Sequence, residues 1–209
     1  FVPQGAGDFD YCIVAGGGGA MTYSGGAGAG GVRTHTGYAA TAQSYAINVG
    51  SGGSRGAISG NSPLATSGGN STMVPTSGTT ISATGGAHAK RASVTPIDTG
   101  GCGAGGGSGA SALAGGAGNA GGDENSLPEG FAGGASIYHH NSHPAGGGGG
   151  AGAVGTAGTD GQGGNGGAGL KILMAMSAAN TTLMLAAADA GVVESSDSNL
   201  RYIAGGGGG

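Results

Sequence analysis

Three histidines within five residues form the densest group of side chains in this sequence that could do chemistry. His139, His140 and His143 could ligate a metal ion if the segment folded back on itself, because imidazole is a common metal ligand. No cysteine, aspartate or glutamate lies within five residues to complete a ligand set. We therefore predict no metal site. We expect these histidines to be exposed loop residues that contact a partner together with Phe131 and Tyr138.

No motif in the sequence indicates catalysis or cofactor binding. A Ser/His/Asp triad can be assembled on paper from almost any chain with this many serines, and no GxSxG nucleophile elbow is present. Glycine runs such as Gly103–Gly109 are close to a GxGxxG phosphate loop, but glycine surrounds them in place of the strand and helix that such a loop needs. We predict a non-enzymatic protein with no catalytic residues and no cofactor.

The two cysteines leave two alternatives open. Cys12 and Cys102 could form one disulfide that closes a loop of about ninety residues, which would stabilise the fold by about 4–5 kcal/mol. They could equally be two small buried thiols. No CxxC motif is present, so a zinc site has no thiolate ligands to build on.

Composition constrains how these residues can be positioned. Glycine accounts for 57 of 209 residues, while there are only 3 Phe and no Trp, so an ordinary apolar core is hard to build. Disordered chains are usually rich in charge and proline, whereas this one is 8% charged with 6 Pro and has a mean hydropathy near zero. We therefore expect an ordered fold that uses glycine in an unusual way.

Charge and hydropathy argue against two classes of partner. The net charge is −4, and Lys90-Arg91 is the only adjacent basic pair, so we expect no binding to nucleic acid. The longest apolar candidate, residues 170–190, is interrupted by Lys171, Asn180 and Asp189. We therefore expect no insertion into a membrane.

Glycine recurs with a period of three residues. Related runs occupy residues 16–37 and 100–121, with a few positions skipped. Three residues per turn is the period of the polyproline-II conformation, so one glycine in each triplet makes a stripe without Cβ atoms along the helix. The longest run consists of Gly146, Gly149, Gly152, Gly155, Gly158, Gly161, Gly164 and Gly167.

Such stripes let backbones touch. A polyproline-II helix has no internal hydrogen bonds, so its buried N–H and C=O groups must bond neighbouring helices. We therefore predict a bundle or sandwich of polyglycine-II helices with a few short β-strands, projecting loops and little α-helix. Collagen is excluded because the longest run is short, nearly free of proline and flanked by segments outside the triplet pattern.

β-Branched and aromatic residues predict strands at 9–14, 44–49 and 79–84, each running into glycine. Residues 170–190 could form two strands or one helix. Segments 54–78 and 123–145 break the glycine pattern with prolines, charges and aromatic residues, and we expect both to project as loops.

We predict a single glycine-rich domain over residues 1–209. Its expected parts are strands and first glycine runs in 1–99, a polyglycine-II core in 100–170 containing loop 123–145, and an insertion followed by a terminal glycine run in 171–209.

Several motifs along the chain resemble the glycine-rich domain of phage tail proteins and related extracellular proteins. They are DYCIVAGGGGA, GGAGAGGVRT, YAINVGSGG, ISATGG, GGNGGAGL and YIAGGGGG, which are distributed over most of the chain. Members of that family include the tip adhesins of T-even-like phage long tail fibres, in which a polyglycine-II sandwich presents variable loops to a receptor on the bacterial surface.

The resemblance implies a virion tail-fibre or tip adhesin, located on the virion tail, that binds a protein or glycan on the host surface through its loops. The alternative is a self-assembling subunit of an extracellular filament or matrix, whose partners are copies of itself. Ice binding is a more distant hypothesis, because no regular threonine array is evident. The scaffold by itself does not decide among these functions.

The glycine stripe generates a first prediction. Replacing Gly155 by Val places a branched side chain where a neighbouring backbone is expected, so the variant should fold poorly. Thermal melting of the purified variant measures this effect. An unchanged melting temperature would contradict packing through the stripe at this position.

Overall fold

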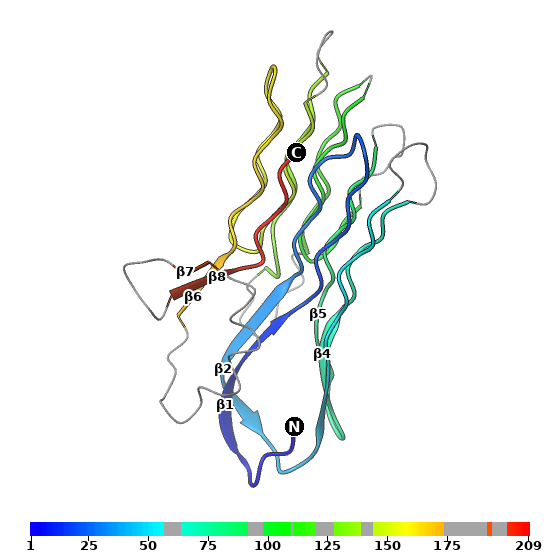
Figure 1. Cartoon of the computed structure of the whole chain (residues 1–209). Helices are drawn as coiled ribbons and strands as arrows, with labels where there is room; N and C mark the ends of the chain where they lie inside the picture. Colours follow the sequence, from blue (N-terminus) through cyan, green and yellow to red (C-terminus); the bar gives the residue numbers. More distant parts are fainter. Residues whose placement is uncertain are drawn as a thin grey trace.

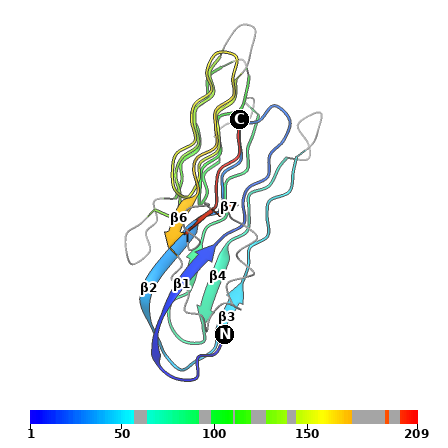
Figure 2. The same ribbon diagram turned by 60° about the vertical axis from the view of Figure 1, so that its left-hand side comes forward.

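A computed structural model shows an elongated molecule with short strands at one end and extended, wavy segments at the other (Figures 1 and 2). It describes residues 1–56, 64–91, 98–109, 111–119, 128–138, 144–173, 192–193 and 200–209. The strands are β1 (Gly7–Val14), β2 (Val32–Ala40), β3 (Tyr45–Asn48), β4 (Ser71–Pro75), β5 (Ile81–Ala83), β6 (Leu170–Leu173), β7 (Val192–Val193) and β8 (Leu200–Ile203).

The strands form three small antiparallel sheets, β1-β2, β3-β4-β5 and β6-β8-β7. The predicted fold class is confirmed, since the described residues contain a few short strands and no α-helix. Strands β1, β3 and β5 coincide with the predicted segments. Strand β2, with the sequence VRTHTGYAA, was not predicted because its polar residues and Gly37 hide the pattern; it is a strand because it pairs with β1 along its length.

Beyond the strands the chain continues as extended segments that are neither helix nor strand and that lie side by side (Figure 1). We call each of them a rod. Their mutual hydrogen bonds join backbone N–H and C=O groups of different rods. The rods comprise residues 15–20, 25–31, 49–56, 64–70, 84–90, 101–108, 112–119, 129–138, 144–152, 153–158, 162–169 and 204–209.

Rod 144–152 is hydrogen-bonded to neighbours on every side. Gly146, Gly147 and Gly148 use their N–H and C=O groups on six different rods, at N···O distances of 2.7–3.0 Å. Gly149 then returns to the two rods that Gly146 bonds, as expected for a helix with three residues per turn. The six neighbours are rods 25–31, 101–108, 129–138, 153–158, 162–169 and 204–209.

Side chains cannot be accommodated around this central rod. A Cβ atom on Gly146, Gly147 or Gly148 would lie 2.0 Å from a carbonyl oxygen, which belongs to a different neighbouring rod in each case. A rod packed on one face needs glycine at one position of each triplet, but a rod surrounded by others needs it at all three. The unbroken glycine run at 146–150 therefore marks the centre of the bundle.

The longest triplet run is not one continuous rod. The chain reverses at residues 151–153 and again at the turn Thr159–Gln162, so the run supplies three neighbouring rods. Gly161 in the second turn has φ 81° and open space where a Cβ would lie. A Cβ on Gly155 would instead lie 2.2 Å from the Gly147 carbonyl oxygen.

Two predicted loops are largely wrong. In segment 54–78, residues 64–70 are a rod, 71–75 are strand β4 and 76–78 belong to the connection between β4 and β5, while residues 57–63 lie outside the described ones. In segment 123–145, residues 129–138 form a rod hydrogen-bonded to the central rod. Their polar and aromatic side chains concealed a backbone that packs like the glycine runs.

The C-terminal part is tied into the bundle. Strand β6 pairs with β8, and rod 204–209 then packs on the central rod through Gly148 N–H donating to Gly207 O and Ala151 N–H donating to Ala204 O. Residues 174–191, for which sequence left two strands or one helix open, lie outside the described residues.

Apolar side chains are concentrated at the strand end. Tyr45, Met73 and Ile81 are buried with Ala40, and Phe9, Tyr11, Ile13 and Tyr38 pack against them. This cluster joins sheet β1-β2 to sheet β3-β4-β5. The scarce aromatic residues of the chain are therefore used mainly to hold two small sheets together, while the rods depend on backbone contacts.

A buried carboxylate links the strands to the rods. Glu129 is 3% exposed and forms an ion pair with Arg33 of β2 at 3.0 Å. Its other oxygen accepts hydrogen bonds from the Thr84 N–H at 2.9 Å and from the Asn119 amide at 3.1 Å. One side chain therefore connects β2 with the beginning of rod 84–90 and the end of rod 112–119.

Adjacent glycines in one rod provide a matched test of the backbone packing. A Cβ on Gly53 would lie 2.0 Å from the Thr66 carbonyl oxygen, whereas one on Gly52 finds its nearest atom at 4.0 Å and φ there is not left-handed. We expect Gly53→Ala to destabilise the protein by about 1–3 kcal/mol or more. Gly52→Ala should be neutral, or stabilising by about 0.4–1 kcal/mol through the unfolded chain.

Urea denaturation of both variants measures the difference in the free energy of unfolding. Equal effects of the two substitutions would contradict the assignment of which side of this rod faces a neighbour.

Candidate functional site

The two ends of the bundle differ in chemistry. Neighbouring rods are joined by turns at the end opposite the strands, where the C-terminus also lies (Figure 1). We call this the turn end. Its described residues include the turns around Tyr23 and Asp160, together with the ends of rods 84–90, 101–108 and 129–138.

Tyr23 is an unusual residue at the turn end. Its φ of 62° lies in the left-handed region, which bulky residues rarely adopt, and its side chain is 66% exposed. The turn around it is held by Ser24, whose hydroxyl donates to the Met21 carbonyl at 2.7 Å and accepts from the Met21 N–H at 3.2 Å. The aromatic ring is therefore held outward on a structured turn.

Two other rods support Tyr23. The Arg91 guanidinium carbon lies 5.1 Å from the centre of the Tyr23 ring, within the range of a cation–π contact. Ser108 donates its hydroxyl hydrogen bond to the Tyr23 carbonyl at 3.1 Å. A β-bridge between Ser24 and Arg91 fixes the two backbones relative to each other. Residues distant in sequence thus meet at the turn end around the exposed Tyr23, while Ser24, Arg91 and Ser108 are half-buried.

Of the predicted partner-binding residues the structure describes Phe131 and Tyr138, and these two do not lie together. Tyr138 is 51% exposed at the end of its rod, but Phe131 is half-buried and its backbone bonds Gly150 and Gly103 inside the bundle. Seven residues of an extended rod separate the two by about 20 Å. His139, His140 and His143 lie outside the described residues.

A charged cluster connects rods 64–70 and 84–90 with Asp98, which precedes rod 101–108. Asp98 forms an ion pair with Lys90, and its other carboxylate oxygen lies 2.6 Å from His88 Nδ1. The Ser67 hydroxyl lies 3.0 Å from the same His88 Nδ1. A catalytic triad needs the acid and the nucleophile on opposite ring nitrogens, so this trio does not have the geometry of one. Burial lowers the pKa of His88, and nearby Lys90 adds to this, while Asp98 opposes it.

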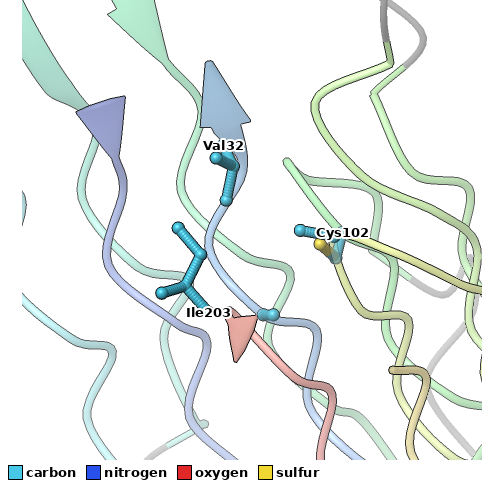
Figure 3. Close-up of a cluster of buried hydrophobic side chains, with 5 residues drawn as sticks. Val32, Cys102 and Ile203 are labelled. Atoms are coloured by element: carbon cyan, nitrogen blue, oxygen red, sulfur yellow. The ribbon is translucent and has the colours of Figure 1, made fainter. Parts of the chain in front are cut away.

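The cysteines are free thiols that belong to one apolar cluster. Cys102 is buried beside Val32 and Ile203 (Figure 3), and Cys12 is half-buried against the same cluster. Burial raises the pKa of both thiols to about 11. Thiols with pKa values this high are protonated at neutral pH and are poor nucleophiles, and both side chains pack in the apolar cluster.

Neither a metal cluster nor a membrane span is found in the part of the chain that the structure describes. No three of its His, Cys, Asp and Glu side chains are grouped so that they could hold a metal ion. None of its elements is a helix long and apolar enough to cross a bilayer.

Comparison with known proteins identifies the family. The chain matches the family described as glycine-rich domain over residues 1–209. Because the match covers the whole chain, the protein belongs to this glycine-rich domain family. Searches of curated proteins and of solved structures gave no significant match.

Titration of His88 generates a prediction. Because its pKa is lowered in the fold, the unfolded chain binds a proton more readily. The stability that neutral His88 contributes is present above its unfolded pKa of about 6.5 and is lost as pH falls through the folded value. We expect the melting temperature to fall more steeply between about pH 7.5 and pH 5 in the parent protein than in His88→Gln. Parallel pH profiles would contradict this role.

Proposed function

We propose that this protein is a phage tail-fibre or tip adhesin that binds a receptor on the host cell surface through its turn end. The observation that carries the proposal is the difference between the interior of the rod bundle and the ends of the rods. Their interiors are closed to side chains, as the Cβ distances around Gly146–Gly148 indicate. Side chains that could discriminate between partners can therefore lie only on the surface of the bundle and at the ends of the rods.

The turn end suits recognition better than the strand end. At the strand end most aromatic side chains are packed between two sheets, and Tyr45 is 1% exposed. At the turn end Tyr23 and Tyr138 are exposed, and Tyr23 is held by contacts from two other rods. A rigid, exposed aromatic side chain loses little conformational entropy when it binds.

A second function is favoured by a different observation. Gly17, Gly52 and Gly205 are exposed, and no atom lies closer than 3.8 Å to the place where their Cβ would be. No packing inside the described part of the chain requires glycine there. Glycine would be required if the backbone of another copy docked on these rods, as in a self-assembling filament subunit.

Attachment to cells tests the first proposal. Fluorescently labelled protein is incubated with a panel of intact bacterial strains, and saturable binding is measured by flow cytometry. Replacing residues 139–143, which join rods 129–138 and 144–152, by a Gly/Ser linker should abolish attachment with little change in the melting temperature. The control Val49→Ser, at an 84% exposed position directly after β3, should attach normally.

Electron microscopy of the same preparation separates the two functions. Discrete tapered particles support the adhesin. Filaments that disappear in the variant Gly52→Ala, combined with no attachment to any strain, would support the filament subunit and overturn the adhesin.

A further inference from the structure

Rod 25–31 has five hydrogen-bonded neighbours among the described rods, whereas the central rod 144–152 has six. Each consecutive pair of the five is itself hydrogen-bonded, so they form an arc around rod 25–31 with one place left between the two ends of the arc. We call this place the open position. In order along the arc, the five neighbours are rods 15–20, 84–90, 101–108, 144–152 and 204–209.

Two backbone donors of rod 25–31 point to the open position. Around the central rod, N–H and C=O groups alternate from one neighbour to the next, as a helix with three residues per turn allows. The C=O groups of Ala27 and Gly28 accept hydrogen bonds from the rods at the two ends of the arc. Alternation therefore directs the Ala27 N–H, and the Gly30 N–H one turn later, between those two rods.

The N–H groups of Ala27 and Gly30 donate to no acceptor in the part of the chain that the structure describes. Gly30 is buried and Ala27 is half-buried. Buried backbone N–H groups are nearly always hydrogen-bonded, because burial removes them from water. An unused donor on a buried residue therefore indicates a missing neighbour at this place.

The two rods beside the open position bring bare backbone to it. Gly17 and Gly207 belong to these rods and are both exposed. A Cβ on Gly207 would have the Ala27 nitrogen as its nearest atom, at 3.4 Å, and a Cβ on Gly17 would lie 3.9 Å from the Gly30 nitrogen. The packing of the described chain leaves room for a side chain at either residue. That side chain would lie beside the two unused donors.

The same two rods also carry unused acceptors. By the alternation seen around the central rod, the C=O groups of Gly18 and Gly208 face the open position. Neither accepts a hydrogen bond from the described residues. The open position thus has donors on its inner side and acceptors on both flanks. A polyproline-II segment that turns C=O groups inward and N–H groups to the flanks matches all three surfaces.

A second copy of this chain fits the open position less well. Outer rods of a copy carry exposed side chains such as Val49, Leu64 and Val154. Rod 204–209 is nearly all glycine, but its Gly207 C=O bonds the central rod. Alternation places N–H groups on the opposite, outward side of that rod. Insertion of this rod would set donors against donors.

We propose that the open position binds a glycine-rich segment of a different protein chain, which adds to the bundle as one further polyproline-II rod. Its C=O groups accept from the N–H groups of Ala27 and Gly30, and its N–H groups donate to the C=O groups of Gly18 and Gly208. This docking surface lies along the side of the bundle. It is separate from the turn end and does not depend on the proposed adhesin function.

Amide hydrogen exchange tests whether the two donors are unused. In the free protein we expect the Ala27 and Gly30 amides to exchange at least about tenfold faster than those of Gly26 and Gly28, which donate to neighbouring rods. Exchange is followed by NMR of the nitrogen-15-labelled full chain. Equal protection of all four amides would show that the position is already filled and would overturn the proposal.

Binding of a defined peptide tests the occupant. The probe contains about nine glycines, three turns of a polyproline-II helix, with a lysine at each end for solubility. We expect saturable shifts of the Ala27 and Gly30 amide signals and slower exchange of both. A matched peptide of sarcosine, which has no N–H, should not bind because it cannot donate to the flanking carbonyls. Absence of saturable binding of the glycine peptide, or equal binding of both peptides, overturns the proposal.

Three glycine substitutions locate the binding surface. Gly17→Ala and Gly207→Ala place a methyl group beside the open donors and should weaken binding of the glycine peptide at least about tenfold. Gly205→Ala is the control, because its Cβ would lie on another side of the same rod, 3.8 Å from the Gly167 carbonyl oxygen. All three should keep or raise the melting temperature, since no internal atom lies closer than 3.4 Å. Unchanged binding by both Gly17→Ala and Gly207→Ala would contradict docking at this place.

Analytical ultracentrifugation of the protein without peptide tests the source of the segment. A monomer that binds the glycine peptide supports docking of a different chain. Self-association that protects the Ala27 and Gly30 amides, and that Gly207→Ala abolishes, would identify a second copy as the occupant and overturn the choice of a different chain.

Discussion

Direct hydrogen bonding between neighbouring backbones, with no Cβ atom between them, is the interaction on which this fold depends. Around the central rod every N–H and C=O of Gly146–Gly148 bonds a different neighbour at 2.7–3.0 Å. These bonds form only when rod axes approach closely, and a methyl group 2.0 Å from a carbonyl oxygen would prevent that approach. Glycine content is therefore a steric requirement here. The entropy lost in ordering glycine is offset by hydrogen bonds that reach every side of the rod.

Because of this constraint, different regions of the molecule are stabilised by different interactions. The rods have little room for buried side chains, so the apolar side chains that stabilise ordinary folds gather between the small sheets around Tyr45 and Met73. Glu129 connects the two regions, because one buried carboxylate bonds β2 and two rods at once. The strand end is thus held by side chains, the rods by backbones, and the junction by an ion pair with its hydrogen bonds.

A scaffold of this kind also explains how recognition can be added without disturbing stability. In the two described turns, Tyr23 and Asp160 lie beyond the hydrogen-bonded ladder and are exposed to solvent. Tyr23 illustrates the point: its unfavourable φ is tolerated because Ser24 and Ser108 fix the turn around it. The fold presents exposed groups on rigid supports, and such groups are suited to binding a ligand.

The sequence alone determined the kind of structure. Glycine at every third residue is a local pattern, and it forms a continuous stripe only on a helix with three residues per turn. The sequence likewise predicted β1, β3 and β5 from runs of β-branched and aromatic residues. Only the tertiary structure decided which rod is central, where the triplet run 146–167 reverses, and that Phe131 lies in a rod. The contacts of Arg91 with Tyr23, of Asp98 with His88 and of Glu129 with Arg33 also depend on the tertiary structure. Periodicity describes the faces of one rod, whereas the neighbours on each face depend on how the chain turns back, and no local pattern records that.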